Sequence, residues 1–285
     1  MVIVRLKGGL GNQMFQYAAA KRVAFEKELP LKLDLTFLEA DAIHHTKRGF
    51  ELNKLMINTE IATAEEVKAI RKKRWGNFFC PVRIKDRGVA DFTKKIARCG
   101  AQVYLDGYWQ SEQHFAPVAD IIRDEFTFRE PIVNDYLLSI KQRIENSASV
   151  SLHFRRGDYV NNPRANKHHG VCSMSYYQNA VNIMAHKTDN PLLFIFSDDI
   201  QWVKANFKSD HPMLFVEQSD EGLHSDFRLM SLCKHNIIAN SSYSWWAAWL
   251  NDNENKTVIA PRQWYQDSRA QSRVAEMIPK EWVTI

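Results

Sequence analysis

The sequence predicts an α/β protein built from parallel sheets, and three observations lead to this prediction. Short apolar runs typical of strands alternate along the chain with segments that have helical starts and ends. The chain begins with a βαβ pattern, and its second half repeats the alternation of strand and helix. Polar or glycine-rich turns follow several predicted strands, which is where open parallel sheets bind ligands.

The length and composition indicate one or two globular domains. The chain has 285 residues, of which 45% are hydrophobic and 25% charged, and these are ordinary values for a globular protein. The polar segment 146–149 precedes a clearly patterned strand. We therefore predict an N-terminal domain of residues 1–148 and a C-terminal domain of residues 149–285, with the last helix free to pack back on the first domain.

Charge, cysteine content and hydropathy exclude several classes of protein. The net charge of +5 is mild and scattered, which does not favour nucleic-acid binding. The basic run Arg71–Arg74 is a solvated helix end or, alternatively, a contact with a membrane surface. No signal peptide and no run of 18 apolar residues is present, which predicts a cytoplasmic protein. We expect free thiols in a reducing compartment, because no metal-like spacing joins the four cysteines, Cys80, Cys99, Cys172 and Cys233.

The start of the chain contains a glycine loop between a strand and a helix. Strand 2–6 leads into Lys7–Asn12, then helix 13–21, and a second strand follows at 31–35. The loop is neither a dinucleotide fingerprint nor a Walker loop, because no Lys-Ser/Thr pair follows Gly11. Two interpretations stay open: backbone amides that bind an anion at a helix start, or a tight turn.

The rest of the first half gives fewer signals. A helix is predicted over 63–74 with Thr63 as its N-cap, and the remainder of 40–100 is irregular and suited to shaping an acceptor site. A strand at 102–106 leads into Tyr108 and Trp109, whose rings either stack on a sugar or belong to the core. Asn134 is expected to cap a helix that reaches Glu145.

The most informative stretch is 150–159. Val150, Leu152 and Phe154 alternate with polar residues, which is the period of a strand, and Arg155 and Arg156 stand at its end. Adjacent guanidinium groups at a buried strand end are costly unless an anion meets them, and their geometry matches phosphate. The alternative is a structural ion pair between Arg156 and Asp158.

The remaining chain supplies two further polar strand ends. Strand 192–196 ends in Asp198 and Asp199, which cap the next helix, bind a ribose or base, or hold Mg²⁺. Strand 236–240 leads into Ser241–Ser244, a second anion cradle before a helix whose tryptophans we expect to be buried. A last strand at 257–261 is expected to close the sheet.

A polar loop is expected between the arginine stretch and the next helix. It covers residues 161–170, and its length and polarity suggest a flexible rim over a site. His168 and His169 lie in it; without further ligands beside them they are more simply solvated than metal-bound.

Three strand ends of the second half can meet at one edge of a parallel sheet. They carry His153, Arg155 and Arg156, then the aspartates, then the serines. Cations, a helix start and carboxylates together describe a site for a nucleoside diphosphate. Because such a group is a leaving group, the pattern points to transfer of whatever its β-phosphate carries.

These residues resemble a known family. The motifs are Gly8-Gly9-Leu10-Gly11-Asn12-Gln13, His153-x-Arg155-Arg156-x-Asp158-Tyr159, Phe196-Ser197-Asp198-Asp199, Ser225-Asp226-Phe227 and Asn240-Ser241-Ser242-Tyr243-Ser244-Trp245-Trp246, with Tyr104–Glu112 as a middle motif. Their combination and order resemble the bacterial α-1,2-fucosyltransferases of glycosyltransferase family 11. The likeness runs from residue 8 to residue 246.

The resemblance implies a fold and an activity. The fold is GT-B type, with two Rossmann-like domains facing each other across a cleft, the first on the acceptor side and the second binding GDP-fucose. The activity is inverting transfer from GDP-β-L-fucose to the 2-hydroxyl of a terminal galactose, without a cofactor or a required metal. Surface-polysaccharide synthesis at the inner face of a bacterial membrane, with peripheral membrane contact, would fit the same likeness.

The resemblance also implies roles for single residues. Arg155 holds the β-phosphate and is the expected catalytic residue, while Arg156 and Asp158 order the turn and Asp158 is also a candidate base. His153 and Asp226 lie near the guanosine. The other expected donor contacts are Gly9, Asn12, Asp198, Ser241, Ser242 and Tyr243. The weaker candidate bases are His168 and His169.

Two other classes of function are compatible with parts of the sequence. Another nucleotide-using enzyme, such as a kinase or a different sugar-nucleotide transferase, would need a Walker lysine or a metal-binding aspartate set. A lectin-like protein would bind glycans through its aromatic rings, and it would not need paired arginines at a strand end.

Overall fold

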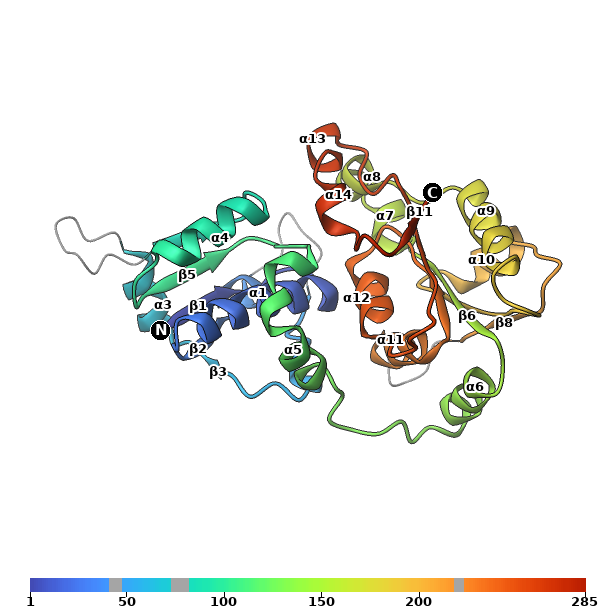
Figure 1. Ribbon diagram of the computed structural model, residues 1–285, viewed down its shortest axis with the longest axis horizontal. Helices are drawn as coiled ribbons and strands as arrows, with labels where there is room; N and C mark the ends of the chain where they lie inside the picture. Colours follow the sequence, from blue (N-terminus) through green and yellow to red (C-terminus); the bar gives the residue numbers. More distant parts are fainter. Residues whose placement is uncertain (41–47, 73–81, 218–222) are drawn as a thin grey trace. The chain divides into compact units, whose positions relative to one another are not determined.

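The computed structural model describes residues 1–40, 48–72, 82–217 and 223–285. Cys80 and the last two residues of the basic run Arg71–Arg74 lie outside these ranges. The chain forms two compact units, Met1–Glu130 and Pro131–Ile285. Each has its own parallel sheet, so the predicted α/β class with two Rossmann-like sheets is confirmed (Figure 1).

The first unit is organised around the sheet order β3-β2-β1-β5-β4. Its strands are β1 (Val2–Arg5), β2 (Leu31–Asp34), β3 (Glu60–Ile61), β4 (Val82–Lys85) and β5 (Val103–Asp106). Its helices are α1 (Leu10–Glu26), α2 (Thr36–Glu39), α3 (Ala64–Arg71), α4 (Val89–Arg98) and α5 (Ala119–Glu125), with 3₁₀ turns η1 (Leu52–Lys54), η2 (Glu112–His114) and η3 (Ala116–Val118). Val2, Ile3 and Val4 of the central strand β1 and most residues of α1 are buried, as a doubly covered parallel sheet requires.

The second unit has the sheet order β11-β10-β9-β6-β7-β8. Its strands are β6 (Ser149–Phe154), β7 (Leu192–Ser197), β8 (Met213–Phe215), β9 (His235–Ile237), β10 (Val258–Ala260) and β11 (Val283–Thr284). Its helices are α6 (Asp135–Glu145), α7 (Gly157–Asn161), α8 (Pro163–His169), α9 (Met174–Ala185), α10 (Ile200–Asn206), α11 (Leu223–Leu232), α12 (Ser242–Leu250), α13 (Ser268–Gln271) and α14 (Val274–Met277).

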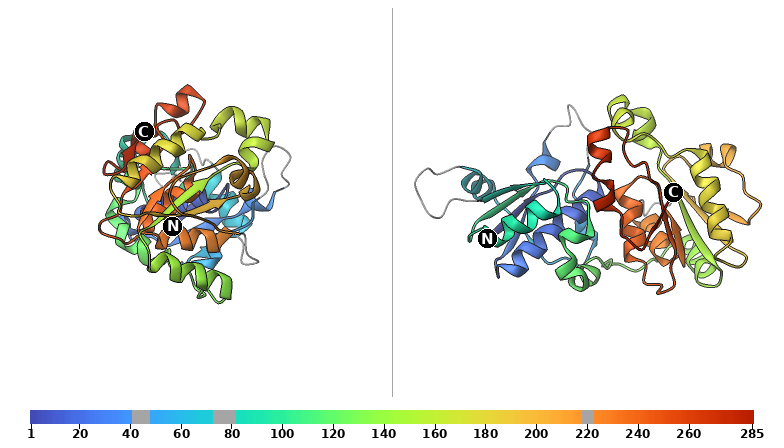
Figure 2. Two further views of the ribbon diagram at one scale, coloured as in Figure 1. Left: turned by 90° about the vertical axis from the view of Figure 1, so that its right-hand side faces the viewer. Right: turned by 45° about the horizontal axis from the view of Figure 1, so that its top comes forward.

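The core of the second unit surrounds β6. Helices α9 and α10 pack their apolar faces on one side of β6 and β7, and α11 and α12 lie on the other side (Figure 1, Figure 2). All six residues of β6 are buried. The predicted strand is therefore confirmed, but both of its faces are covered, whereas the alternation had indicated one core face.

Several local expectations are confirmed in detail. Thr63 caps α3 with a reciprocal capping box to Glu66, and Asn134 caps α6 by accepting from the backbone N–H of Leu137. The tryptophans of α12 are buried, and so is Trp109, whereas Tyr108 is 40% exposed. Cys99, Cys172 and Cys233 carry free thiols.

Other expectations were wrong. Segment 161–170 is not a loop, because α7 and α8 occupy it almost entirely; Asn162 caps α8 through the backbone N–H groups of residues 164 and 165, and Pro163 takes the first helical position. Residues 257–261 do not close the sheet, since β11 pairs outside β10. The irregular first half contains β4 and α4, which the sequence did not predict.

The unit boundary also differs from residue 148. Helix α6 belongs to the second unit, because it contacts α11 and buries its own Leu137, Ile140 and Ile144. The final helix α14 contacts its own unit, where Trp245 Nε1 donates to the carbonyl of Met277 at 2.9 Å.

Candidate active site

The end of β6 places two guanidinium groups beside the carboxyl end of β7. Arg155 and Arg156 follow the last strand residue, and α7 begins at Gly157. Their side chains are only 17% and 15% exposed. Because β6 and β7 run parallel in register, with Phe154 opposite Ser197, Asp198 and Asp199 come to the same edge. The sequence prediction that these strand ends meet is confirmed.

Arg155 is held by two carboxylates. Its Nη2 lies 2.5 Å from Asp158 Oδ1, and its Nη1 lies 2.7 Å from Asp198 Oδ2. Burial alone would lower the pKa of Arg155, but the attraction of Asp198 and Asp158 outweighs it and raises that pKa. The alternative interpretation, an ion pair between Arg156 and Asp158, is therefore wrong in its partner: Asp158 lies three residues after Arg155, along the first turn of α7, and pairs with Arg155.

Arg156 is fixed on the neighbouring side. Its Nε donates to Asp199 Oδ2 at 3.1 Å, and its guanidinium carbon lies 3.3 Å from the centre of the Trp202 ring, a stacked arrangement that arginine favours. Asp199 also accepts from the backbone N–H of Trp202 at 3.4 Å, so the helix-capping interpretation of this residue is confirmed.

Asp198 and Gly157 fit closely together. Asp198 Oδ1 accepts from the backbone N–H of Arg156 at 2.8 Å while its other oxygen meets Arg155. A Cβ atom at position 157 would collide with this carboxylate. Glycine is therefore required here by the approach of Asp198, a role that sequence reasoning missed because its cause is a residue 41 positions away.

A second part of the site joins β6 to α11 and α12. The ring of His153 lies 5.7 Å from that of Tyr243, which in turn lies 5.4 Å from Phe227. His153 and Asp226 are each 5% exposed. His153 Nδ1 and Asp226 Oδ1 are buried and have no hydrogen-bond partner within the described residues. Buried polar atoms normally have partners, so these two are candidates for contact with a ligand.

Burial changes the protonation of both groups. It raises the pKa of Asp226 to about 7, and it lowers the pKa of His153 to about 3, with the positive charge of Arg155 as a second cause. His153 is therefore a neutral imidazole at physiological pH, and Asp226 titrates close to neutrality.

The serine turn forms the start of α12. Ser241 is the N-cap and accepts from the backbone N–H of Tyr243 at 3.4 Å, and the helix begins at Ser242. Tyr159, which lies 5.4 Å below the guanidinium of Arg155, donates through its hydroxyl to the carbonyl of Asn240 at 3.3 Å. This bond ties the arginine turn to the turn that precedes α12.

The glycine loop belongs to the first unit. Helix α1 begins at Leu10, earlier than predicted, and Gly9 is its N-cap without any side-chain cap. Asn12 Oδ1 accepts from Gln110 Nε2 at 2.7 Å, and a Cβ on Gly9 would meet nothing within 4 Å. The loop thus presents an open, uncapped helix start, which favours anions.

The weaker candidate bases occupy a different environment. His169 stacks on Tyr159 with ring centres 4.5 Å apart, and burial together with His168 lowers its pKa to about 4. Within the described ranges, no group of three or more His, Cys, Asp or Glu side chains is arranged to hold a metal ion. The described helices include none that is long and apolar enough to cross a bilayer.

The fold and this arrangement of cations and helix starts at the sheet edge suit the binding of a nucleoside diphosphate, and comparison with known proteins shows the family. All of residues 1–285 match the family described as Glycosyl transferase family 11. The chain belongs to that family.

Several individual proteins are similar to it. An Escherichia coli protein named alpha-1,2-colitosyltransferase is 36% identical over 300 residues, covering 100% of this chain and 99% of the other. The E. coli O-antigen biosynthesis glycosyltransferase WbnK is also 36% identical, covering 98% and 99%. Galactoside alpha-(1,2)-fucosyltransferase 2 of Hylobates lar is 24% identical, covering 87% and 68%.

The fold is also found in a solved structure of a plant protein. It is a mutant of Arabidopsis thaliana FUT1 in complex with GDP, with a TM-score of 0.53 and 10% sequence identity, over 91% of this chain and 70% of that chain. Together with the two parallel sheets, this match confirms the predicted GT-B class of fold.

Proposed function

We propose that the protein transfers L-fucose from GDP-β-L-fucose to the 2-hydroxyl of a terminal galactose, with inversion to an α-1,2 linkage. The observation that carries the proposal is the Arg155 centre together with the unpartnered atoms of His153 and Asp226 in the same unit. A cation suits a diphosphate, and two orphaned polar atoms suit a purine edge. The names of the relatives and the GDP bound to the FUT1 mutant support the same assignment.

Arg155 can hold a phosphate even though two carboxylates contact it. A guanidinium carries five N–H groups, and the ion pairs with Asp158 and Asp198 engage one terminal nitrogen each. The remaining N–H groups are available to the β-phosphate. The carboxylates then orient the guanidinium, and Arg156 and Asp158 order the turn that presents it.

The other donor contacts follow from their positions. His153 and Asp226 are assigned to the guanosine, where the ionised carboxylate accepts from N–H groups of the base. Ser241, Ser242, Tyr243 and the backbone of Gly9 are assigned to the diphosphate, because helix starts supply N–H groups and a favourable dipole. Asp198 acts through Arg155, and Asn12 fixes the first turn of α1.

In the proposed reaction, the acceptor oxygen attacks C1 of fucose from the face opposite GDP. The new C–O bond forms as the bond from C1 to the β-phosphate oxygen breaks, and the acceptor proton leaves to a base or to water. Negative charge grows on the departing phosphate, where Arg155 and the helix start stabilise it more than in the ground state. We propose that this charge stabilisation makes a metal unnecessary.

A second donor sugar follows from one relative. The 36% identical protein from E. coli is named a colitosyltransferase, so colitose is the alternative to fucose at the same position. We further propose that the enzyme acts in the cytoplasm, with peripheral contact at the inner membrane face, in surface-polysaccharide synthesis.

The test is a donor and acceptor panel. The protein is incubated with GDP-fucose, GDP-colitose or GDP-mannose and a set of β-galactosides, and the product linkage is determined by NMR. We expect an α-1,2-fucosylated galactoside as the product, and we expect the same rate of product formation when EDTA is present. A preference for GDP-colitose would show that colitose, not fucose, is the donor sugar. Glycan binding without any product would favour the lectin-like class. Arg155→Ala serves as the inactive control.

A further inference from the structure

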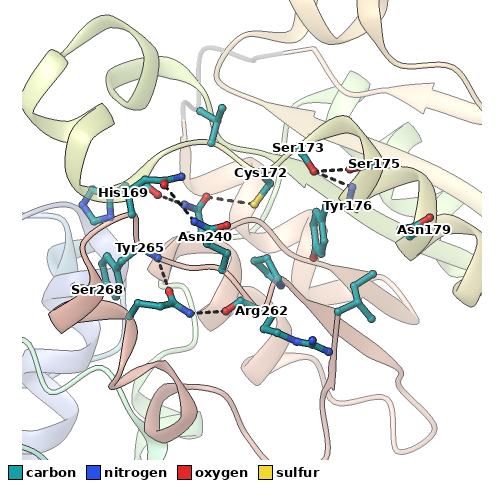
Figure 3. A pocket seen from close by; sticks show the side chains of 16 residues that line it. His169, Cys172, Ser173, Ser175, Tyr176, Asn179, Asn240, Arg262, Tyr265 and Ser268 are labelled. Atoms are coloured by element: carbon teal, nitrogen blue, oxygen red, sulfur yellow. Dashed lines mark hydrogen bonds between the residues drawn. The ribbon is translucent and has the colours of Figure 1, made fainter.

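The second unit contains a cavity that the proposed reaction does not use. It has a volume of about 830 Å³ and lies between the start of α9, the carboxyl ends of β9 and β10, and the segment that follows β10. Figure 3 shows Ser173, Ser175, Tyr176 and Asn179 on one side and Tyr265 and Ser268 on the other. Its size is in the upper part of the range of ligand pockets, about 300–1,000 Å³.

The floor of the cavity is held by hydrogen bonds that are buried or partly buried. Asn240 Nδ2 donates to the carbonyls of His169 and Trp264, each at 3.1 Å. Tyr176 donates its hydroxyl to the carbonyl of Ile238 at 2.6 Å. Gln271 Oε1 accepts from the backbone N–H groups of Trp264 and Tyr265, each at 2.9 Å. A floor fixed in this way needs little ordering when a ligand binds.

The rim carries polar groups that have no intramolecular partner. The Asn179 amide, the Arg262 guanidinium and the Ser268 hydroxyl are all exposed, and none has a hydrogen bond or ion pair within the described part of the chain. The hydroxyls of Ser173 and Ser175 lie 2.8 Å apart and add further donors and acceptors. The cavity therefore offers both kinds of hydrogen-bonding group within reach of one ligand.

The chemistry of the lining side chains indicates which class of ligand the cavity can bind. No Asp or Glu side chain is among the described residues that line the cavity, and Arg262 adds a positive charge, which does not favour a cation or polyamine. Tyr265 is 8% exposed and is packed against the rings of His168 and His169, so its ring offers little surface on which a nucleobase could stack. Amides, hydroxyls and one arginine match a ligand that is rich in hydroxyl groups.

We propose that this cavity binds a saccharide of two or more sugar units, at a site separate from the Arg155 centre. Two stacked rings separate the cavity from the Arg155 centre. His169 lines the cavity and stacks on Tyr159, and the other neighbour of the Tyr159 ring is the guanidinium of Arg155. The bound saccharide is a part of a glycan remote from the reacting hydroxyl. The inference goes beyond the proposed function, since it holds for any donor sugar.

The experiment measures binding without a donor. Lacto-N-tetraose, a galactose-terminated tetrasaccharide, is titrated into the full chain labelled with ¹⁵N. We expect the backbone amides of residues 173–176 and 262–268 to shift. In the double variant Asn179→Ala/Arg262→Ala, loss of two hydrogen-bonding side chains should weaken this binding about tenfold. The matched control is Asn255→Ala/Arg143→Ala, two exposed positions away from the cavity, and it should bind as the unchanged protein does.

The outcomes separate this inference from the proposed function. No shift at residues 173–176 and 262–268 with about 10 mM tetrasaccharide overturns it, and so does a double variant that binds as tightly as the control. Shifts at the cavity that the double variant loses support it, whichever nucleotide sugar the enzyme turns over. Both double variants should retain turnover of a simple β-galactoside within about twofold.

Discussion

At the scale of single residues, Arg155 has the largest role in the proposed reaction, because it stabilises the departing phosphate. Its guanidinium is largely buried, lies over the ring of Tyr159 and contacts two carboxylates. Replacement by alanine removes the cation that stabilises the departing phosphate, so the turnover number should fall about 100- to 1,000-fold. The measurement is kcat with GDP-fucose and a galactoside at saturating concentration.

The Arg155→Ala variant also leaves Asp158 and Asp198 without their cation. Some loss of stability is therefore expected, because two partly buried carboxylates each lose an ion pair. Arg155→Lys separates the two effects, since it keeps a charge but not the two-nitrogen geometry. It should melt closer to the unchanged protein and still lose most of the rate. A fully active Arg155→Ala would remove Arg155 from the mechanism.

Asp158 is a candidate base and also the partner of Arg155, and one substitution distinguishes these roles. The 2.5 Å contact with Arg155 Nη2 favours the partner role. Asp158→Asn should then lower kcat about three- to tenfold, since a neutral hydrogen bond holds the arginine less firmly. The pH–rate profile should keep its acidic limb. If that limb disappears together with a loss of 100-fold or more, Asp158 is the base.

Asp226 and His153 give opposite pH dependences of stability. Burial raises the pKa of Asp226 from 3.8 to about 7, so the folded state binds the proton more tightly and stability falls as pH rises through this window. The pKa of His153 is lowered from 6.5 to about 3, so its contribution is complete above pH 6.5 and is lost as pH falls towards 3.

Asp226→Asn tests the first of these effects and the donor assignment together. The variant should be more stable at pH 8 by about 1 kcal/mol or more, because a buried charge is removed. GDP should bind about ten- to 100-fold more weakly, because a charge-assisted hydrogen bond to the base is lost. Thermal unfolding and calorimetric titration at pH 8 measure both. Unchanged GDP affinity would contradict the assignment of Asp226 to guanosine.

At the scale of elements, the sequence predicted that the ends of β6 and β7 meet, but it did not predict the helices α7 and α8 that follow β6. The period of residues 150–154 predicted β6, and the parallel arrangement brought Asp198 and Asp199 beside Arg155. Which arginine pairs with which carboxylate was not predictable, because the pairing depends on helix α7 at Gly157–Asn161. The sequence had indicated only a turn there, before the polar loop expected at 161–170. Capping by Asn162 and the Pro163 at the helix start were the signals for α8.

Gly157 links α7 to β7, and its replacement is the test at this scale. A Cβ at Gly157 collides with the carboxylate of Asp198, which is fixed by Arg155 and by the backbone of Arg156. Gly157→Ala should therefore displace Asp198, cost about 1–3 kcal/mol of stability, and reduce kcat because Arg155 loses one of its two supports. Chemical denaturation and steady-state kinetics give the two values.

Gly100→Ala is the matched control for this test. A Cβ at Gly100 would meet nothing within 4 Å, and its backbone is outside the positive-φ region. It should leave both stability and rate within the experimental scatter. If Gly157→Ala behaved in the same way, the close fit between Gly157 and Asp198 would have no functional consequence.

For the whole molecule, composition and alternation predicted the class of fold but not the unit boundary. The polar segment 146–149 looked like a linker, yet residues 146–148 are the short connection from α6 to β6 within one unit and Ser149 begins β6. Helix α6 contacts α11, and no local sequence pattern predicts such a long-range contact. In the same way β4, β8 and β11 are too short to show a clear period, so only pairing with neighbouring strands reveals them.

This boundary makes a prediction about fragments. A fragment of residues 131–285 should fold cooperatively, because it retains α6 and with it the buried side chains of Leu137, Ile140 and Ile144. A fragment of residues 149–285 loses these three side chains and exposes the surface that they cover. Its stability should be lower by several kcal/mol, at about 1.5–3 kcal/mol for each buried side chain. Urea denaturation followed by circular dichroism compares them.

The same fragments test how the donor contacts are divided. His153, Arg155, Asp226 and the start of α12 lie in residues 131–285, whereas Gly9 and Asn12 lie in the first unit. If the second unit binds the nucleotide as proposed, fragment 131–285 should bind GDP, and its affinity should be lower than that of the full chain by the contribution of the Gly9 loop. A folded fragment without any GDP affinity would show that the second unit alone does not make the donor site, and the roles assigned to Arg155 and Asp226 would then fail together.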